Sequence, residues 1–396
     1  MTNGLDRFLR PRPEPMSSSF DIVAYGDAHG PGLVRLWTRF FGPWSAKRLE
    51  RRWAWQFEMN PFQCDQPGGR PVILVAVANG DVVGHISGIP IPTKVGGREL
   101  PVLAASGLVV DHDHRWAGIA LVRELAARAP VLATAMTGAA TAILARCGVH
   151  VAKASHVRFT YPLGYAGELT IKARARLSDP LAWLASPWVC RAAASWYVPR
   201  GKEPPRPLPP RAAGPTGVVI RPITRFNETY DEFWTHVSDG LRWTVRKDAA
   251  YMNWRYLDCP TVSPVCLAAY ERTDHLIGVG VAMGRAKTDR AGRPCMFMGE
   301  ITELLTRDPA HAATEHLLRS LMHAIHRDSI DSIGASYMRA SLHPLFERCG
   351  FDRMDASDFA AALGPERNGH SNADWGDGAA CYYTAGDGDS LYSAGF

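Results

Sequence analysis

Lysine is scarce in this chain, and its basic residues are not gathered in one place. Only 7 of the 44 basic residues are lysine, the formal net charge over 396 residues is +5, and no run of five like charges occurs. Proteins that bind nucleic acid usually concentrate their basic residues in a patch or an arm. We therefore expect no nucleic-acid partner.

Patterns that mark zinc sites and secretion are also missing. The eight cysteines never form a C-x-x-C pair, and scattered cysteines are typical of buried thiols in a reducing compartment. The first fifteen residues, MTNGLDRFLRPRPEP, are charged and proline-rich, unlike a signal peptide. These absences predict a cytoplasmic protein without a bound metal.

No long apolar run fits a membrane-spanning helix. The one candidate, residues 181–198, has 18 residues and is interrupted by Pro187 and Arg191. A spanning helix needs about 20 mostly apolar residues. We expect this segment to be a packing helix between two globular halves, and no membrane span.

What the sequence does contain is a repeat. With 46% hydrophobic and 21% charged residues, the chain has enough apolar material for more than one globular domain. Matching features recur in one order about half the chain apart: Trp37-Thr38 with Trp234-Thr235, 55–61 with 254–260, the predicted hairpins 71–84 with 264–278, and 143–149 with 345–351. The repeat predicts two tandem units of one α/β (α+β) fold, each a mixed, mostly antiparallel sheet flanked by helices.

A proline-rich segment separates the two halves. Residues 201–216 hold six prolines in sixteen positions, which favours an extended spacer. We place the first unit at 18–165, a helical extension and linker at 166–216, and the second unit at 217–392. On this division, residues 151–200 contain the closing strand of the first unit and its extension.

The segment with the clearest chemistry is SGLVVDHDHRWAGIALVREL, residues 106–125. A buried strand is expected to end at a polar turn, and a helix to begin near Gly118, so that several backbone N–H groups converge. The helix dipole adds roughly half a positive charge there, Gly118 and Ala120 leave room, and Arg115 adds a cation. This pattern predicts a site for a phosphate or pyrophosphate.

The same segment resembles the acyl-CoA motif of the GNAT superfamily of N-acyltransferases, R/Q-x-x-G-x-G/A after a strand ending in apolar-Val-x-Pro. His112 stands where proline is common, and the phrases RCGV and RCGF resemble the family's closing helix. The resemblance covers roughly residues 20–390 and implies acetyl-CoA or another acyl-CoA as co-substrate, with pantetheine along the strand, in a splay beside residues 131–136, and pyrophosphate at the helix. The implied cofactor-binding residues are Leu108, Val109, Val110, Arg115, Trp116, Ala117, Gly118, Ile119 and Ala120.

The chain departs from the family where acid and base are usual. Leu144 and Phe346 stand at the position of the closing-helix tyrosine, and residues 103–107 carry no carboxylate. The candidate bases are Glu300, Glu303 and His85. Each has a plainer interpretation: the two glutamates as strand-edge carboxylates paired with arginine, on opposite faces because they are three apart, and the histidine as a hydrogen-bonded strand residue.

Two further segments bear on the site. Asp111-His112-Asp113-His114 could suggest a metal, but four consecutive ligands seldom reach one ion, and we favour a structural or phosphate-side role. In the second unit the phosphate segment aligns with 311–316, where Glu315 would repel phosphates. We therefore expect the acyl donor in the first unit, with the second unit contributing to the acceptor pocket.

These observations favour an acyl-CoA-dependent N-acyltransferase, and among these we expect an N-acetyltransferase, in which a primary amine of a small molecule attacks the thioester directly. Two alternatives stay open: a non-catalytic protein that binds CoA or a partner, and an aminoacyl-tRNA-dependent aminoacyltransferase of the tandem GNAT-like type. The sequence does not identify the amine or the oligomeric state.

Overall fold

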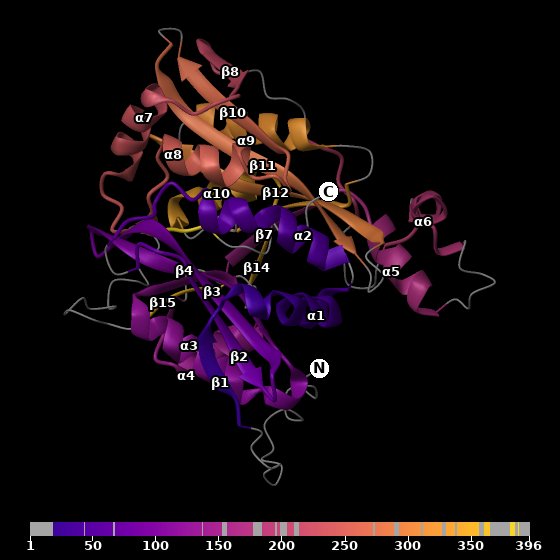
Figure 1. Ribbon diagram of the computed structural model, residues 1–396. Helices are drawn as coiled ribbons and strands as arrows, with labels where there is room; N and C mark the ends of the chain where they lie inside the picture. The colour runs from indigo at the N-terminus through magenta and orange to yellow at the C-terminus, as the bar shows by residue number, and fades with distance from the viewer. Residues whose placement is uncertain are drawn as a thin grey trace.

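The structure is a computed structural model, shown in Figure 1. It describes residues 19–42, 44–65, 68–136, 138–152, 157–176, 184–194, 196–198, 204–209, 214–271, 274–288, 293–309, 312–326, 330–336, 339–355, 360–364, 381–384 and 387. Two sheets, one in each half of the molecule, form its framework.

The first sheet is built mainly from the first half of the chain. Its strand order is β1-β2-β3-β4-β5-β15-β6, and β9 joins it by pairing with both β3 and β16. All neighbours are antiparallel except the parallel pairs β4–β5 and β9–β16. The strands are β1 (Asp21–Ala24), β2 (Val72–Ala78), β3 (Asp81–Val95), β4 (Arg98–Val110), β5 (Val131–Met136), β6 (His150–Ala152), β9 (Trp243–Val245), β15 (Ala360–Gly364) and β16 (Cys381–Tyr382).

The second sheet repeats this order. It runs β14-β7-β13-β12-β11-β10-β8, and only β12–β13 is parallel. The strands are β7 (Val157–Pro162), β8 (Val218–Pro222), β10 (Pro264–Glu271), β11 (Leu276–Thr288), β12 (Pro294–Thr306), β13 (Ser332–Ala335) and β14 (Asp352–Asp355). The predicted fold class, two units with mixed and mostly antiparallel sheets, is confirmed.

Tight turns set the hairpins that the sequence predicts. Asn79 and Gly80 both have positive φ, 51° and 81°, between β2 and β3, and Gly96 and Gly97, at 61° and 87°, join β3 to β4. Two consecutive left-handed residues are the signature of a two-residue turn whose twist matches that of the strands. These turns place β2, β3 and β4 side by side as a meander.

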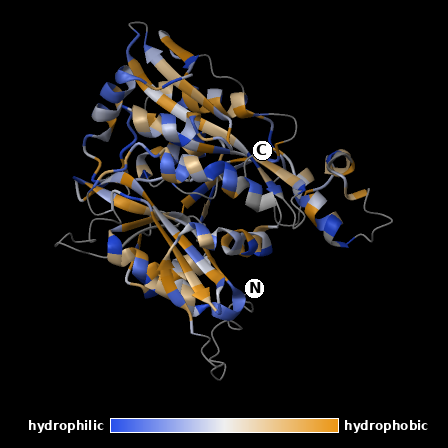
Figure 2. Ribbon diagram, in the orientation of Figure 1, coloured by the Kyte–Doolittle hydropathy of each residue, from blue (hydrophilic) through white to orange (hydrophobic). Residues whose placement is uncertain are grey.

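Helices flank both sheets (Figure 1). In each half a helix that follows the central strand packs on one face, α3 against β2, β3 and β4 and α9 against β10, β11 and β12. Figure 2 shows hydrophobic residues running along the strands of both sheets, while the helices carry many hydrophilic ones. The α-helices are α1 (Gly30–Phe41), α2 (Trp44–Trp53), α3 (Trp116–Arg128), α4 (Gly138–Arg146), α5 (Ala166–Arg176), α6 (Pro187–Ala194), α7 (Glu228–Ser238), α8 (Ala249–Met252), α9 (Ala312–Ile325) and α10 (His343–Arg348), with short helical turns η1 (Asp27–His29), η2 (Ala54–Glu58), η3 (His112–His114), η6 (Asn253–Leu257) and η7 (Ala340–Leu342).

The two units exchange a strand. β7, from the first half, lies between β13 and β14 of the second sheet, and β15, from the second half, lies between β5 and β6 of the first. The expectation that the strand after residue 150 closes the first unit is therefore wrong for β7, although β6 does stay in the first sheet. The position of β7 depends on tertiary contacts. A strand can pair wherever two neighbouring strands leave their edges open, and the sequence of β7 alone does not specify in which sheet this occurs.

The repeated aromatic segments meet between the units. Trp55 in η2 and Trp254 in η6 stack with ring centroids 5.1 Å apart, and each indole N–H donates to the other's backbone carbonyl, at 2.7 and 3.0 Å. Residues of both halves, such as Val102 and Leu304, belong to one buried cluster. The two tryptophans therefore form a contact that joins the units.

The apolar segment 181–198 is not one long helix. Its described part contains α6, eight residues that begin at Pro187. Among the residues that the structure describes, no helix is long and apolar enough to cross a membrane.

Candidate functional site

A bulge interrupts the central strand of the first sheet. The register passes from Ser87 opposite Ser106 to His85 opposite Val109, so Gly107 and Leu108 together face a single residue of β3. Gly107 has φ of +64°, and a Cβ built there would lie 3.0 Å from the Trp37 ring and 3.1 Å from the His85 ring. Only glycine fits, because it is the residue that tolerates this φ without steric cost and it presents no side chain to the two rings.

Beyond the bulge, β4 separates from its parallel neighbour. The two strands pair only at Leu103 with Val131 and Ala104 with Leu132, although both continue beyond those residues. From Ala105 to Val110, β4 therefore has no β5 partner among the described residues. The family resemblance implies a splay between residues 108–110 and 131–136, and the opening lies there. An extended ligand can pair with the open edge of the strand.

The predicted phosphate segment lies where β4 meets α3. Arg115 is the N-cap of α3, but no side chain caps the helix, so its first-turn N–H groups lack a side-chain acceptor. Trp116 is 73% exposed, which shows that this end of the helix faces solvent. A Cβ at Gly118 would meet its nearest described neighbours at 3.4 and 3.7 Å, an ordinary contact distance. Gly118 is buried on the side of α3 that faces Val110 and Ile143, and packing there does not require a glycine.

Two arginines lie at this loop. Arg115 is exposed and folds back onto His112, donating from Nε to its carbonyl oxygen at 3.2 Å and bonding its ring through Nη2. Arg39, on α1, forms an ion pair with Asp111 at the end of β4. Sequence reasoning missed Arg39, because it lies 72 positions from Asp111 and only the packing of α1 on the sheet brings the two together.

The acidic and histidine-rich turn holds itself together. Asp111 accepts from the backbone N–H of Asp113 at 3.2 Å in addition to its ion pair with Arg39, and His112 bonds Asp113 at 3.3 Å. Within the described ranges, no group of three or more His, Cys, Asp or Glu side chains could hold a metal ion. The geometry of Asp111 suits a structural role in shaping the loop.

In the corresponding loop of the second unit, threonine hydroxyl groups form hydrogen bonds that close the loop. Thr314, which aligns with Gly118, donates to the carbonyl oxygen of Asp308 at 2.8 Å and shares a 2.8 Å hydrogen bond with Thr306. Glu315 pairs with Arg319 one turn along α9. The aligned His311 lies outside the described residues.

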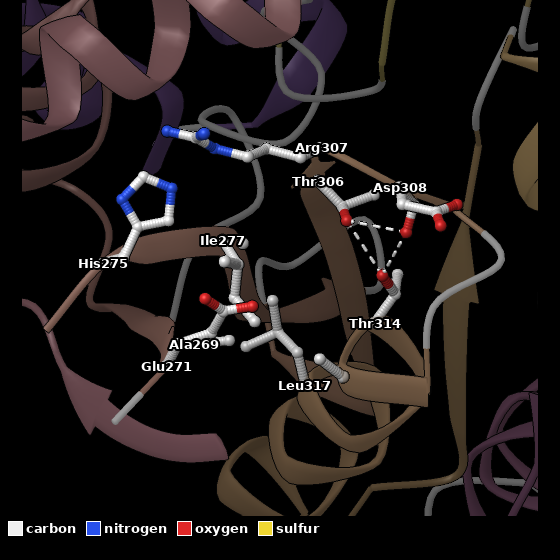
Figure 3. A pocket seen from close by; sticks show the side chains of 11 residues that line it. Ala269, Glu271, His275, Ile277, Thr306, Arg307, Asp308, Thr314 and Leu317 are labelled. Carbon is white, nitrogen blue, oxygen red and sulfur yellow. Dashed lines mark hydrogen bonds between the residues drawn. The ribbon is translucent and has the colours of Figure 1, made fainter. Parts of the chain in front are cut away.

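A cavity of about 230 Å³ lies beside this second loop, between the β10–β11 hairpin and the start of α9 (Figure 3). Its apolar lining includes Ile277 and Leu317, and Figure 3 shows Arg307 and His275 on one side of it. It is bordered by the hairpin on one side and by the start of the helix on the other.

The second splay is filled by the C-terminal part of the chain. β12 pairs with β13 only from Met298 to Ile301, so its last residues have no β13 partner among those described. The backbone N–H of Leu304 donates instead to the Tyr382 hydroxyl, at 3.1 Å. An N–H given to Tyr382 cannot point at β11, so it points to the side where the splay opens. Tyr382 therefore occupies in the second sheet the place that the first sheet leaves open.

Glu303 belongs to a fully buried hydrogen-bond network beside Tyr382. It accepts from Lys247 at 2.7 Å, Tyr256 at 2.6 Å and Tyr382 at 2.8 Å, and Lys247 also pairs with Asp387. Burial raises the pKa of Glu303, and the neighbouring Asp387 raises it further, while Lys247 opposes both. A carboxylate enclosed in this way has no route to a substrate amine. The geometry favours a structural role for Glu303.

Glu300 is also fully buried, with its Oε2 3.7 Å from Arg158 and 3.8 Å from Arg285. The expectation of opposite faces is wrong. A register shift lies between the two glutamates, so that Glu300 faces Met283 and Glu303 faces Val281, and partners two apart lie on one face. Nor is β12 an edge strand, because β11 and β13 flank it.

The positions of the family's closing-helix tyrosine are packed into the core. Leu144 is 3% exposed, and Phe346 is fully buried and stacks on Phe159 of the exchanged strand at 5.0 Å. Neither side chain can carry a proton. His85, the third predicted candidate, is 2% exposed and bonds the carbonyl oxygen of Gly107 through Nδ1 at 2.8 Å.

Comparison with known proteins agrees with this architecture. In its fold the chain is similar to a GCN5-related N-acetyltransferase from Anabaena variabilis ATCC 29413, with a TM-score of 0.50, 11% identity, and coverage of 87% of this chain and 72% of that one. It is also similar to the Saccharomyces cerevisiae N-myristoyltransferase crystallised with myristoyl-CoA, with a TM-score of 0.53, 13% identity, and coverage of 89% and 79%. No family model and no curated protein matches the sequence.

The chain therefore has the fold of the GNAT superfamily, present as two tandem units. At these identities the likeness establishes the fold, and the chemistry has to be argued from the site.

Proposed function

We propose that this protein is an acyl-CoA-dependent N-acyltransferase, acting on a primary amine of a small molecule, with one acyl-CoA site in the first unit. The observation that supports it most is that the β4–β5 splay leads directly to an uncapped, solvent-facing helix N-terminus. In the second unit, Tyr382 fills the corresponding splay, and the hydrogen bonds of Thr314 close the corresponding loop at the start of the helix.

The residues of the first unit fit a CoA thioester along its length. Pyrophosphate would accept from the N–H groups at the start of α3, within residues 115–120, with the exposed Arg115 as a cation beside them. Pantetheine would pair with the open edge of β4 at Leu108, Val109 and Val110. Acetyl-CoA is the donor we favour.

In the reaction, the amine nitrogen attacks the thioester carbonyl carbon, and the carbonyl π electrons move onto oxygen. When the intermediate collapses, the C–S bond breaks, CoA leaves as the thiolate, and the nitrogen loses a proton while the sulfur gains one. Backbone N–H groups at the bulge would stabilise the negative oxygen. We assign no residue as acid or base, because Glu303 and Glu300 are enclosed and Leu144 and Phe346 cannot transfer a proton.

The first test is acetyl-CoA binding by variants of the phosphate loop. Arg115→Gln should weaken binding about tenfold, since one charge-assisted contact contributes roughly 1.5–3 kcal/mol. Trp116→Asp should lower the affinity further, because Trp116 is exposed on the first turn of α3 and a carboxylate there places a negative charge beside the phosphates. The measurement is isothermal titration calorimetry with acetyl-CoA on purified full-length protein.

The matched control is Arg128→Gln, at the other end of the same helix, where an exposed arginine pairs with Glu124. It removes the same charge and should leave affinity unchanged. Equal losses from Arg115→Gln and Arg128→Gln would show a non-specific charge effect and contradict the proposed site.

Release of free thiol across a panel of small primary amines then separates the candidate functions. Binding with turnover supports the acyltransferase, and binding without turnover on any amine supports the non-catalytic CoA-binding alternative. If wild type does not bind acetyl-CoA, the acyl-CoA proposal fails and the aminoacyl-tRNA alternative gains.

A further inference from the structure

His85 lies on β3, opposite Val109 and next to the bulge of β4. Its Nδ1 lies 2.8 Å from the carbonyl oxygen of Gly107, the residue that forms the bulge. A carbonyl oxygen can only accept, so Nδ1 must carry the proton and donate. The ring is therefore fixed in the form protonated at Nδ1 for as long as this bond exists.

The bond orients the next peptide group. In a trans peptide the C=O of one residue and the N–H of the next point in opposite directions. The Gly107 carbonyl points at the His85 ring, so the N–H of Leu108 points away from that ring. Leu108 lies in the part of β4 that has no β5 partner among the described residues, because the pairing ends at Ala104.

We propose that His85 is a positioning residue that holds the Gly107–Leu108 peptide so that the Leu108 N–H faces the acyl thioester oxygen. This inference rests on the proposed acyl-CoA site, and it gives a task to a histidine that otherwise resembles a base. His85 acts through the peptide and does not itself touch the substrate.

The surroundings keep His85 in this arrangement. The Trp37 ring packs edge-on against it, with centroids 6.0 Å apart and an interplanar angle of 67°, and the His85 ring is 2% exposed. A Cβ at Gly107 would strike both rings. Gly107, His85 and Trp37 therefore pack closely around the Gly107–Leu108 peptide, so that a movement of any of the three residues would turn this peptide.

The second unit provides an internal comparison. In the alignment of the two hairpins Gly84 matches Gly278, so Val279, opposite Leu305, takes the place of His85, and it has no group that could fix a peptide. The irregular residue there, Thr302, donates its own hydroxyl to the Val281 carbonyl at 3.2 Å. Only the unit with the open splay has the histidine, which is the distribution expected if the histidine serves a ligand in that splay.

Two substitutions separate positioning from other roles. His85→Leu removes the donor while keeping an apolar side chain of related size. His85→Asn keeps an N–H donor close to the position of Nδ1 but has no group that titrates near neutral pH. Circular dichroism and thermal unfolding of both variants first establish that they fold.

The decisive readout does not depend on the acceptor amine. Acetyl-CoA labelled with ¹³C at the thioester carbonyl is bound to each protein, and its carbonyl stretch is recorded by infrared difference spectroscopy. A hydrogen bond from the Leu108 N–H should lower this frequency in wild type and in His85→Asn. In His85→Leu the shift should be lost, with the acetyl-CoA Kd changed less than twofold.

Where an acceptor amine is found, kcat of His85→Leu should fall about 100-fold, the cost of losing one oxyanion donor, while KM for acetyl-CoA stays the same. His85→Asn should recover most of kcat. A general base predicts the opposite pattern, in which both variants are equally inactive and the acidic limb of the kcat–pH profile disappears.

The outcomes distinguish this inference from the function on which it rests. An equal carbonyl shift in wild type and His85→Leu, or equal inactivity of both variants, overturns the positioning role and leaves the acyl-CoA site standing. Absence of acetyl-CoA binding by wild type overturns both.

Discussion

At the scale of single residues, the buried charges of the second unit explain why carboxylates in a suggestive position do not make a site. Lys247, Glu303 and Asp387 are fully buried and close together, and the hydroxyls of Tyr251, Tyr256 and Tyr382 complete their hydrogen bonds. Taking charges out of water is expensive, so such a group persists only when each member is paired. Here the pairing anchors the C-terminal segment in the second splay.

Lys247→Met should lower the free energy of unfolding by about 3–5 kcal/mol, because it leaves Glu303 and Asp387 as neighbouring buried carboxylates without their cation. Urea denaturation followed by tryptophan fluorescence measures the change. The control is Lys172→Met, whose pair with Glu168 lies at the surface and should contribute little to stability. If the two variants lost the same stability, the buried network would not be an anchor.

At the scale of elements, the bulge in β4 and its glycine shape the open splay. Gly97 also has positive φ, +87°, but a Cβ there would meet nothing within 4 Å, whereas at Gly107 it would meet two aromatic rings. The two glycines therefore separate the cost of backbone conformation from the cost of crowding.

Gly97→Ala should cost about 1–2 kcal/mol of stability, the penalty of a left-handed residue. Gly107→Ala should cost more, by about 1 kcal/mol or above, because Trp37 and His85 must also move. Thermal and chemical unfolding of both variants measures the difference. Equal losses would show that the bulge has room for a side chain.

At the scale of the whole molecule, the exchanged strands tie the two units into one structure. Without β15 the first sheet loses the strand between β5 and β6, and without β7 the second loses the strand between β13 and β14. The shared buried cluster and the Trp55–Trp254 stack add contacts across the same boundary.

The full chain should therefore unfold in one cooperative transition. In differential scanning calorimetry, the van't Hoff and calorimetric enthalpies should agree, although a chain of two units would ordinarily show two transitions. Two resolved peaks, each assigned to one half, would contradict coupling through the exchanged strands.

Much of this protein was predictable from local patterns. The alternation in residues 71–84, the turn at Asn79-Gly80 and the helical spacing after Gly118 are short-range signals, and the structure has the hairpin and the helix that they predict. The repeat predicted the second copy of the fold, because similar segments in the same order fold in similar ways. The loop that ends β4 was likewise predictable, since strand, turn and helix are continuous in sequence.

Tertiary structure alone decided the rest, because it depends on contacts between residues far apart in the chain. Four features follow from strand edges and bulges that no local pattern encodes. They are the sheet that β7 joins, the approach of Arg39 to Asp111, the shared face of Glu300 and Glu303, and the position of Tyr382 in the second splay. The sequence determined that there are two units of one fold and that a strand, a turn and a helix follow one another over residues 106–125. The packing decided that one splay is open and the other filled, because a strand edge is satisfied by whatever segment the whole fold brings to it.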